Sequence, residues 1–273
     1  MGSPLSIGKY LALTRVGVLV WMAYRLGALM RLIDFPIIIG VYSYLFAALY
    51  RSLPAGERHL GGLDLNQTLT YIALVWIIES LINTRLDADI GNDVRDGRIA
   101  VYLARPVDVQ GYYLFQTLGH VGYRLAMISI PIALFAAFAF GVHLPPDWAA
   151  GGAFLLAGIG AFALMFLINF CLGIVAFFME WNYGLSLMKE ALLRGLGGLL
   201  IPLTVMPASV QSTLLKTPFP YLYYIPVQVW LGSLRGPGLS EALTQQYCWV
   251  ALLLLLSRLL QTAALRRVSI AGG

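Results

Sequence analysis

The chain has 273 residues, of which 59% are hydrophobic and only 11% are charged, and its mean hydropathy is +0.78. A soluble domain carries about 25% charged residues, so this chain has too few polar groups to cover a globular surface. The composition excludes a soluble enzyme, a disordered chain and a nucleic-acid-binding module. It predicts an all-α polytopic membrane protein, in which the net charge of +5 reflects basic loops on the cytoplasmic side of a bilayer.

The first helix expected along the chain covers residues 5–30. Lys9, Arg15 and Arg25 interrupt its apolar residues, and the longest uninterrupted stretch, residues 16–24, is too short to cross ~30 Å of hydrocarbon. We predict a helix that lies at the cytoplasmic interface, and a true span is the alternative. Six further stretches approach the ~20 residues that a spanning helix needs. These predicted spans are residues 33–50, 69–84, 112–140, 149–178, 185–205 and 247–264.

The basic residues set the orientation of the predicted spans. They gather before the first span, after the second and after the sixth: Lys9, Arg15, Arg25, Arg31, Arg85, Arg95, Arg98, Arg105, Arg266 and Arg267. Because loops rich in Lys and Arg stay in the cytoplasm, both termini are expected there, in a single membrane domain of residues 1–273. The two cysteines, Cys171 and Cys248, lie in apolar stretches, so no disulfide framework is expected.

Residues 85–108 form the longest charged segment, between the second and third predicted spans. Within it, the apolar residues 99–103 follow Gly97 and end before Arg105 and Pro106. Proline would terminate a short helix at that point. We predict a short helix that projects into the cytosol and docks on a partner, and a solvated loop is the alternative.

Residues 207–235 form a second unusual segment, after the fifth predicted span. Pro218, Pro220 and Pro226 prevent a regular helix. The segment also carries aromatic residues of the kind found at the membrane–water boundary: Tyr221, Tyr223, Tyr224 and Trp230. It is too apolar for an ordinary loop and too broken for a span, so we predict a re-entrant or interfacial hairpin on the outer side, buried against protein.

Ionisable groups at membrane depth are costly and often functional. Glu79 lies within the second predicted span, and Glu180 lies near the inner end of the fourth, next to Trp181. These three residues are candidates for a transport pathway. The alternatives for Glu79 are a structural pair with an arginine of a neighbouring helix and a water-facing placement in a cavity. The three histidines lack metal-ligand spacing, so no metal site is expected. The sequence also contains neither a catalytic motif nor a GxxxxGK[ST] phosphate loop.

The order of these features resembles the membrane subunits of type-2 ABC exporters, the ABC-2-type permeases, and in particular a bacterial branch that includes viologen and multidrug exporters. Two patterns carry the resemblance across nearly the whole chain. The first is matched by Ile90, Asp93, Arg95, Gly97, Ile99, Leu103, Arg105 and Pro106. The second is matched by Gly198, Ile201, Pro202, Leu203, Pro207, Leu214, Pro218, Phe219, Tyr221, Tyr224 and Pro226.

The resemblance implies a half-transporter in the bacterial inner membrane that pairs with a second copy or a sister permease. A separate ATPase subunit would bind ATP and Mg²⁺, so this chain would hold no cofactor and have no catalytic residue. The coupling residues would be Asp93, Arg95, Gly97, Arg98, Ile99, Leu103, Arg105 and Pro106. The outer gate would comprise Pro218, Phe219, Pro220, Tyr221, Tyr224 and Pro226. Two other classes stay open, an ion-coupled secondary transporter that uses Glu79 and Glu180, and an intramembrane enzyme acting on lipids.

Overall fold

The computed structural model describes residues 7–23, 25–54, 59–103, 107–179 and 183–271, and these residues form helices and no β-strand. The α-helices are α1 (Ile7–Ala23), α2 (Arg25–Ser52), α3 (Leu65–Ile82), α4 (Leu86–Arg95), α5 (Ile99–Leu103), α6 (Val109–Arg124), α7 (Ile130–Phe140), α8 (Trp148–Val175), α9 (Tyr183–Leu196), α10 (Ala208–Leu214), α11 (Tyr224–Trp230) and α12 (Gly236–Ala271). A π-helical turn, Leu125–Ser129, joins α6 to α7. The predicted all-α membrane fold is confirmed.

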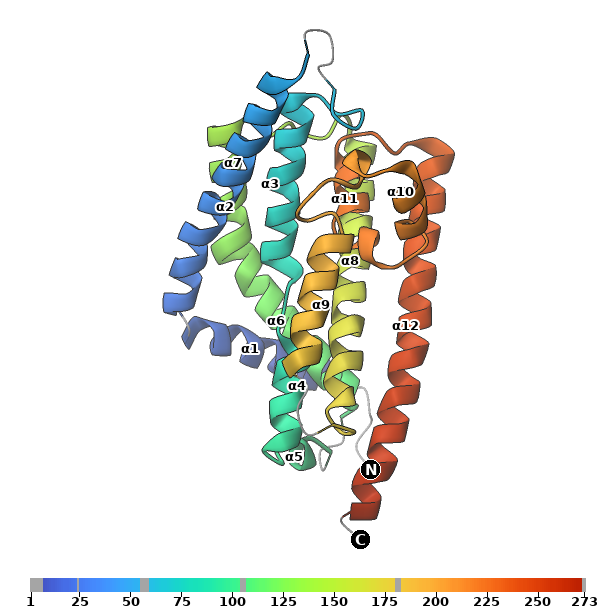
Figure 1. The fold of residues 1–273 in the computed structure, drawn as a ribbon. Helices are drawn as coiled ribbons and strands as arrows, with labels where there is room; N and C mark the ends of the chain where they lie inside the picture. Colours follow the sequence, from blue (N-terminus) through green and yellow to red (C-terminus); the bar gives the residue numbers. More distant parts are fainter. Residues whose placement is uncertain (1–6, 24, 55–58, 104–106, 180–182, 272–273) are drawn as a thin grey trace.

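Five helical stretches of the described residues are long and apolar enough to cross a membrane: Leu26–Ser52, Leu65–Arg95, Val109–Phe140, Trp148–Val175 and Gly236–Arg266. They run along the long axis of the molecule (Figure 1). The start of α1 and the end of α12 lie at the same end of the bundle as α4 and α5, whereas the α2–α3, α7–α8 and α11–α12 connections lie at the opposite end (Figure 1). The predicted cytoplasmic segments therefore share one end of the molecule.

The predicted fifth span, residues 185–205, is not one continuous helix. Its helix α9 has 14 residues, about 21 Å at 1.5 Å per residue, which is short of the ~30 Å hydrocarbon layer. The chain turns at Gly198, whose φ of +84° lies in the left-handed region, and Pro202 follows. The return pass from α8 to α12 consists of α9, this turn and the short helices α10 and α11 (Figure 1). Average hydropathy missed the break because the turn residues are themselves apolar or small.

The N-terminal helix differs from its predicted bounds, because α1 covers Ile7–Ala23 and residues 25–30 belong to α2. Helix α1 lies across the bundle rather than along it (Figure 1), and its backbone touches that of α6. A Cβ built on Gly17 would lie 2.2 Å from the Gln116 carbonyl oxygen, and one on Gly119 would lie 2.1 Å from the Thr14 carbonyl oxygen. Glycine at both positions allows this close crossing.

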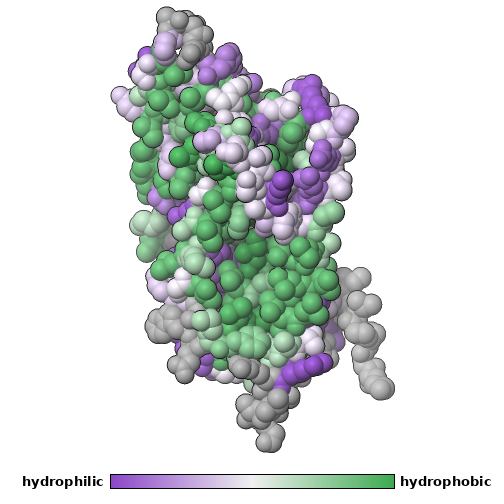
Figure 2. All heavy atoms as spheres, turned by 45° about the vertical axis from the view of Figure 1, so that its right-hand side comes forward, coloured by the Kyte–Doolittle hydropathy of each residue, from purple (hydrophilic) through white to green (hydrophobic). Residues whose placement is uncertain are grey.

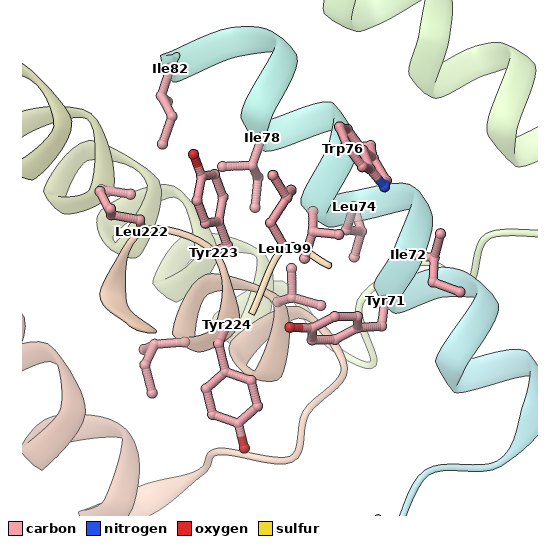
Figure 3. Close-up of a cluster of buried hydrophobic side chains, with 14 of the residues drawn as sticks. Tyr71, Ile72, Leu74, Trp76, Ile78, Ile82, Leu199, Leu222, Tyr223 and Tyr224 are labelled. Carbon is pink, nitrogen blue, oxygen red and sulfur yellow. The ribbon is translucent and has the colours of Figure 1, made fainter. Parts of the chain in front are cut away.

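The largest group of buried apolar side chains joins α3 to the segment that follows α9. Tyr71 and Trp76 of α3 lie in one cluster with Leu199, Tyr223 and Tyr224 (Figure 3). This packing fixes the predicted hairpin against the bundle.

The outside of the bundle is largely apolar. Hydrophobic side chains cover much of the face that carries α12 (Figure 2), where five leucines are exposed: Leu252, Leu254, Leu255, Leu256 and Leu259. Lipid or another apolar surface is the environment that such a face requires.

Candidate functional site

The described part of the predicted coupling segment, residues 85–108, contains two short helices, α4 and α5, at the end of the bundle that also holds α1 and the end of α12 (Figure 1). Helix α4 continues beyond α3 after a break at residues 83–85, and α5 follows a turn at Gly97. Gly97 has a φ of +72° and donates its amide to the Val94 carbonyl oxygen at 3.1 Å. Left-handed backbone favours glycine at this turn. The prediction of a helix over residues 99–103 is confirmed.

Charged side chains hold the α4–α5 turn. The Arg98 Nε donates to Asp93 Oδ1 at 2.9 Å, and the Tyr113 hydroxyl donates to Asp93 Oδ2 at 2.9 Å. Arg98 also pairs with Asp96 at 3.0 Å. The hydrogen bond with Asp93 raises the pKa of Arg98, which stays fully cationic. Asp93 therefore ties the exposed turn to α6.

The two helices divide their side chains between the bundle and the solvent. Ile90 and Ile99 are buried in one cluster with Phe170 and Ile174 of α8. Ile90 fits against Gly173, where an added Cβ would come within 2.7 Å of the Ile90 Cβ. Outside the cluster, exposed side chains cover the turn: Arg95, Asp96, Arg98, Ala100 and Val101. An exposed surface on a rigidly packed base is suited to contact with a partner.

The side chains of three predicted coupling residues lie outside the described part of the structure. Arg105 and Pro106 lie outside the described residues, as does the side chain of Leu103. The remaining coupling residues gather around the α4–α5 turn: Asp93, Arg95, Gly97, Arg98 and Ile99. Their role in coupling stays a prediction.

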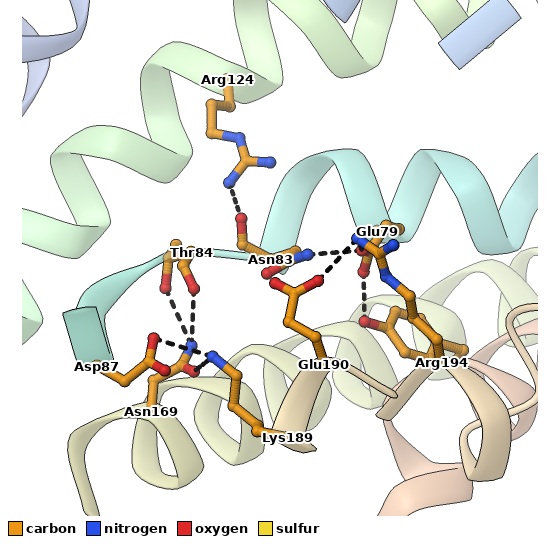
Figure 4. A network of polar contacts seen from close by, with 10 residues as sticks. Glu79, Asn83, Thr84, Asp87, Arg124, Asn169, Lys189, Glu190 and Arg194 are labelled. Carbon is orange, nitrogen blue, oxygen red and sulfur yellow. Dashed lines mark hydrogen bonds and ion pairs between the residues drawn. The ribbon is translucent and has the colours of Figure 1, made fainter. Parts of the chain in front are cut away.

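A buried ion pair links α4 to α9. The Lys189 Nζ lies 2.9 Å from Asp87 Oδ1, and the two side chains are 5% and 1% exposed (Figure 4). Lys189 also donates to Asn169 Oδ1 of α8 at 2.7 Å. The Asn169 amide in turn donates to the Thr84 carbonyl oxygen at 3.1 Å, within the α3–α4 break. Where α3 is interrupted, a side chain of α8 thus bonds a free backbone carbonyl oxygen and a side chain of α9 neutralises a buried carboxylate.

A second set of polar contacts surrounds Glu79, the deepest carboxylate of α3. Tyr223, from the segment before α11, donates its hydroxyl to Glu79 Oε2, and the Asn83 amide donates to Glu79 Oε1 at 2.6 Å (Figure 4). Arg194 of α9 lies 3.8 Å from Glu79 and pairs with Glu190 at 2.8 Å. The structure therefore gives Glu79 the arginine neighbour that the sequence left as the alternative. The other two pathway candidates, Glu180 and Trp181, lie outside the described residues.

Lys189, Asn169 and Asp87 were not predicted as site residues. An asparagine within a 28-residue apolar helix is a usable signal, because such a side chain needs a partner away from lipid. The sequence does not say which partner it finds, since that depends on the rotation of each helix.

The predicted outer-gate residues come together in the segment before α12. Tyr221 and Tyr224 are buried, as are Pro220 and Pro226. The Tyr221 hydroxyl donates to the Leu215 carbonyl oxygen at 3.1 Å, and Gln246 of α12 donates to the Tyr221 carbonyl oxygen at 3.0 Å. Pro218 and Phe219 are half-buried beside them. The prediction of a broken segment buried against protein is confirmed, and its role as a gate stays a prediction.

Comparison with protein-family models gives a match over most of the chain. A protein-family model described as ABC-2 family transporter protein matches residues 37–272, which include every helix except α1 and the start of α2. No curated protein matches the chain. In the described parts of the chain, no group of three His, Cys, Asp or Glu side chains is placed to hold a metal ion.

Proposed function

Since the chain belongs to the ABC-2 family of transporter proteins, we propose that it is the permease subunit of an ATP-binding cassette exporter. It moves an amphipathic, drug-like compound or a lipid outward across a bacterial inner membrane. The permease lacks an ATPase site, and a separate nucleotide-binding subunit supplies ATP hydrolysis with Mg²⁺. A second copy, or a sister permease, completes the pathway, and both termini lie in the cytoplasm.

The observation that carries this proposal is the connection between the α4–α5 turn and the broken segment before α12. Asp87 of α4 is joined to Lys189 of α9 by a buried ion pair. Helix α9 leads directly to the Gly198 turn, and the Gly198 carbonyl oxygen accepts a hydrogen bond from the buried Tyr71 hydroxyl at 2.6 Å. Movement of the exposed turn by a motor subunit would therefore displace α9 and, through it, the hairpin of α10 and α11.

The test is ATP-driven transport by the permease reconstituted with a co-expressed ABC ATPase. Gly97→Ala forces a side chain into a left-handed position, at a cost of about 1–2 kcal/mol, although nothing lies within 4 Å of the new Cβ. In the double variant Gly97→Ala, Arg98→Ala, we expect ATP hydrolysis to continue while transport falls. Gly97→Asn is the matched control, because asparagine tolerates this backbone.

Two outcomes would contradict the proposal. Unchanged coupling in the Gly97→Ala, Arg98→Ala variant would remove the turn from its coupling role. Transport driven by a pH gradient in the absence of any ATPase, and abolished by Glu79→Gln, would favour an ion-coupled transporter instead. Glu79 is the residue to test for that alternative, because it is buried and accepts the Tyr223 hydroxyl.

A further inference from the structure

A cavity of about 520 Å³ lies beside the α3–α4 break, at the end of the bundle that holds α1. Its wall includes Trp21 of α1, Arg31 of α2, Arg85 at the start of α4 and His120 of α6. A second cavity, of about 290 Å³, adjoins the break on the side of α9, and Arg31 and Arg85 line it too. The two arginines therefore stand between the cavities and face both.

A third arginine, Arg124 of α6, lies beside the first cavity and is fully buried. Its guanidinium and that of Arg31 each lie 5.5 Å from the Trp21 ring. One nitrogen of Arg124 donates to the Asn83 carbonyl oxygen, whereas Nε and Nη2 are buried and have no hydrogen-bond partner within the described residues. Buried donors without partners are costly, so a missing acceptor is the simplest account of them.

The carboxylates near this place do not pair directly with the three arginines. In the described part of the chain, neither Arg31, Arg85 nor Arg124 forms an ion pair. The nearby carboxylates have other partners: Asp87 pairs with Lys189, Asp93 with Arg98, and Glu190 with Arg194. Asp34 and Asp89 are exposed at the rims. Glu79, which lines the second cavity, is contacted by Tyr223, Asn83 and Arg194. Within the described residues, the three arginines around the break therefore have no carboxylate in direct contact.

The wall offers further hydrogen-bond donors to an anion. Helix α4 has 10 residues and begins at this cavity with no side-chain cap on its N-terminus, where backbone N–H groups and the helix dipole favour negative charge. His120 faces the cavity, and its Nε2 is buried without a hydrogen-bond partner in the described structure. Arginine forks match the oxygens of a phosphate group in pairs.

We propose that this cavity binds a phosphate-bearing anion, held by Arg31 and Arg85 with Arg124 and His120 behind them. The group belongs either to the headgroup of a membrane lipid or to a soluble phosphate compound. A lipid source is supported by the apolar surface next to the cavity, since Leu19 and Met22 of α1 and Leu29 and Ile33 of α2 are all more than half exposed. The bound anion joins α2 to the start of α4 and so steadies the coupling segment.

The experiment measures lipid binding to the purified full chain without any ATPase, so its failure is distinct from failure of the exporter proposal. Retained phosphatidylglycerol and phosphatidylcholine are counted by native mass spectrometry in wild type and in Arg31→Gln, Arg85→Gln. We expect wild type to retain phosphatidylglycerol and the double variant to bind it roughly tenfold or more weakly, since hydrogen bonds to charged groups are the strong ones. Arg51→Gln, at the exposed opposite end of α2, is the matched control and should bind as wild type does.

A second arm separates the two sources of phosphate. Inorganic phosphate and glycerol phosphate are titrated against wild type while the melting temperature is followed. A soluble ligand is supported if these ions raise the melting temperature of wild type, if the double variant loses this stabilisation, and if wild type retains no lipid. Arg31→Lys and Arg85→Lys should each recover part of the binding, and the single Arg85→Gln variant tests the exposed arginine if the double variant does not fold. Equal binding of both lipids and both phosphates by wild type and the arginine-to-glutamine variants would overturn the proposal.

Discussion

Two interruptions of helical structure lie inside this bundle, and they are stabilised by different means. At the α3–α4 break, Arg124 and Asn169 donate to the backbone carbonyl oxygens of Asn83 and Thr84. Lys189 bonds the Asn169 side chain and pairs with Asp87. At the break between α9 and α11, apolar contacts and tyrosine hydroxyls do most of this work, with Tyr71 bonding the Gly198 carbonyl oxygen. The first break is stabilised by a buried ion pair and hydrogen bonds, and the second is stabilised mainly by the close packing of apolar side chains.

Helix α9 connects the two interruptions. Lys189 near its middle reaches the first break, and the second begins just after its last residue, Leu196. Arg194 lies between them and contacts Glu79, which also receives the Tyr223 hydroxyl from the second break. A helix that is held at its middle by Lys189 and near its C-terminal end by Arg194 transmits displacement between the two breaks. Changes that weaken either contact should therefore uncouple the two regions.

The largest effect is expected from breaking the Lys189–Asp87 pair. Lys189→Met leaves the Asp87 carboxylate buried without its cation, which costs about 3–5 kcal/mol. The double variant Asp87→Leu, Lys189→Met should recover much of the loss, because replacing both charges of a buried pair is often neutral. Thermal unfolding of the purified protein measures both, with Lys216→Met as the exposed control. A single variant as stable as wild type would show that the pair does not hold the break.

The second largest effect is expected at Gly198, in the break between α9 and α11. Gly198→Ala adds left-handed strain and places a Cβ 2.7 Å from both the Leu203 Cδ1 and the Tyr71 hydroxyl oxygen, so we expect a loss of about 2–4 kcal/mol in stability. Gly62→Ala is the matched control, because its φ of +80° brings similar strain but nothing lies within 4 Å of its Cβ. The difference between the two variants isolates the packing contribution. Equal losses would mean that the turn is not tightly packed.

Sequence reasoning predicted the two breaks unequally. The prolines and tyrosines of residues 207–235 indicated the second break, since proline forbids a regular helix and buried backbone then needs other partners. The first break has no such signal: Asn83 and Thr84 are ordinary residues, and their partners come from α6 and α8. Which side chains meet across helices depends on helix rotation, which hydropathy does not fix.

The long apolar helices were predicted well, because lipid requires a continuous run of apolar residues. Helix α9 was extended too far, to residue 205, since the turn after it is as apolar as a span. The exposed coupling turn was predicted from Gly97 and the apolar residues 99–103. The cavity at Arg31 and Arg85 was not, because it depends on how α1 and α2 pack against the break.

Smaller losses of stability are expected from removing the hydroxyl groups of two buried tyrosines, Tyr223 and Tyr71. Tyr223→Phe removes the hydroxyl donated to Glu79, a hydrogen bond worth about 1.5–3 kcal/mol when the carboxylate is ionised. Tyr71→Phe removes a bond to the neutral Gly198 carbonyl oxygen and should cost about 0.5–1.5 kcal/mol. Both side chains are buried, so the comparison is matched in burial. The order of the two melting temperatures checks it, and a larger loss for Tyr71→Phe would contradict the importance of Glu79.

The smallest effect on stability is expected from the ion pair between Asp108 and Arg258, which is exposed at one end of the bundle. The Asp108 carboxylate caps α6 by accepting the Gly111 amide at 2.8 Å, and it accepts Arg258 at 2.7 Å. Partial burial acts to raise the pKa of Asp108, but these hydrogen bonds outweigh it and the pKa lies below its usual value. A lowered pKa means that the ionised carboxylate stabilises the fold above the unfolded pKa of about 3.9, and that this stability is lost as pH falls through the folded pKa.

The Arg258→Gln variant tests that contribution. Because the side chains of Arg258 and Asp108 are 50% and 37% exposed, solvent screening limits the pair to about 1 kcal/mol or less. The variant should melt slightly below wild type at pH 7, and the gap should close as the pH is lowered through the folded pKa, where Asp108 is protonated in both proteins. Lys216→Gln, exposed at the opposite end, should show no such gap. A difference that grows in acid would have the wrong sign for this pair, whereas the buried Lys189–Asp87 pair should keep a far larger effect throughout neutral pH.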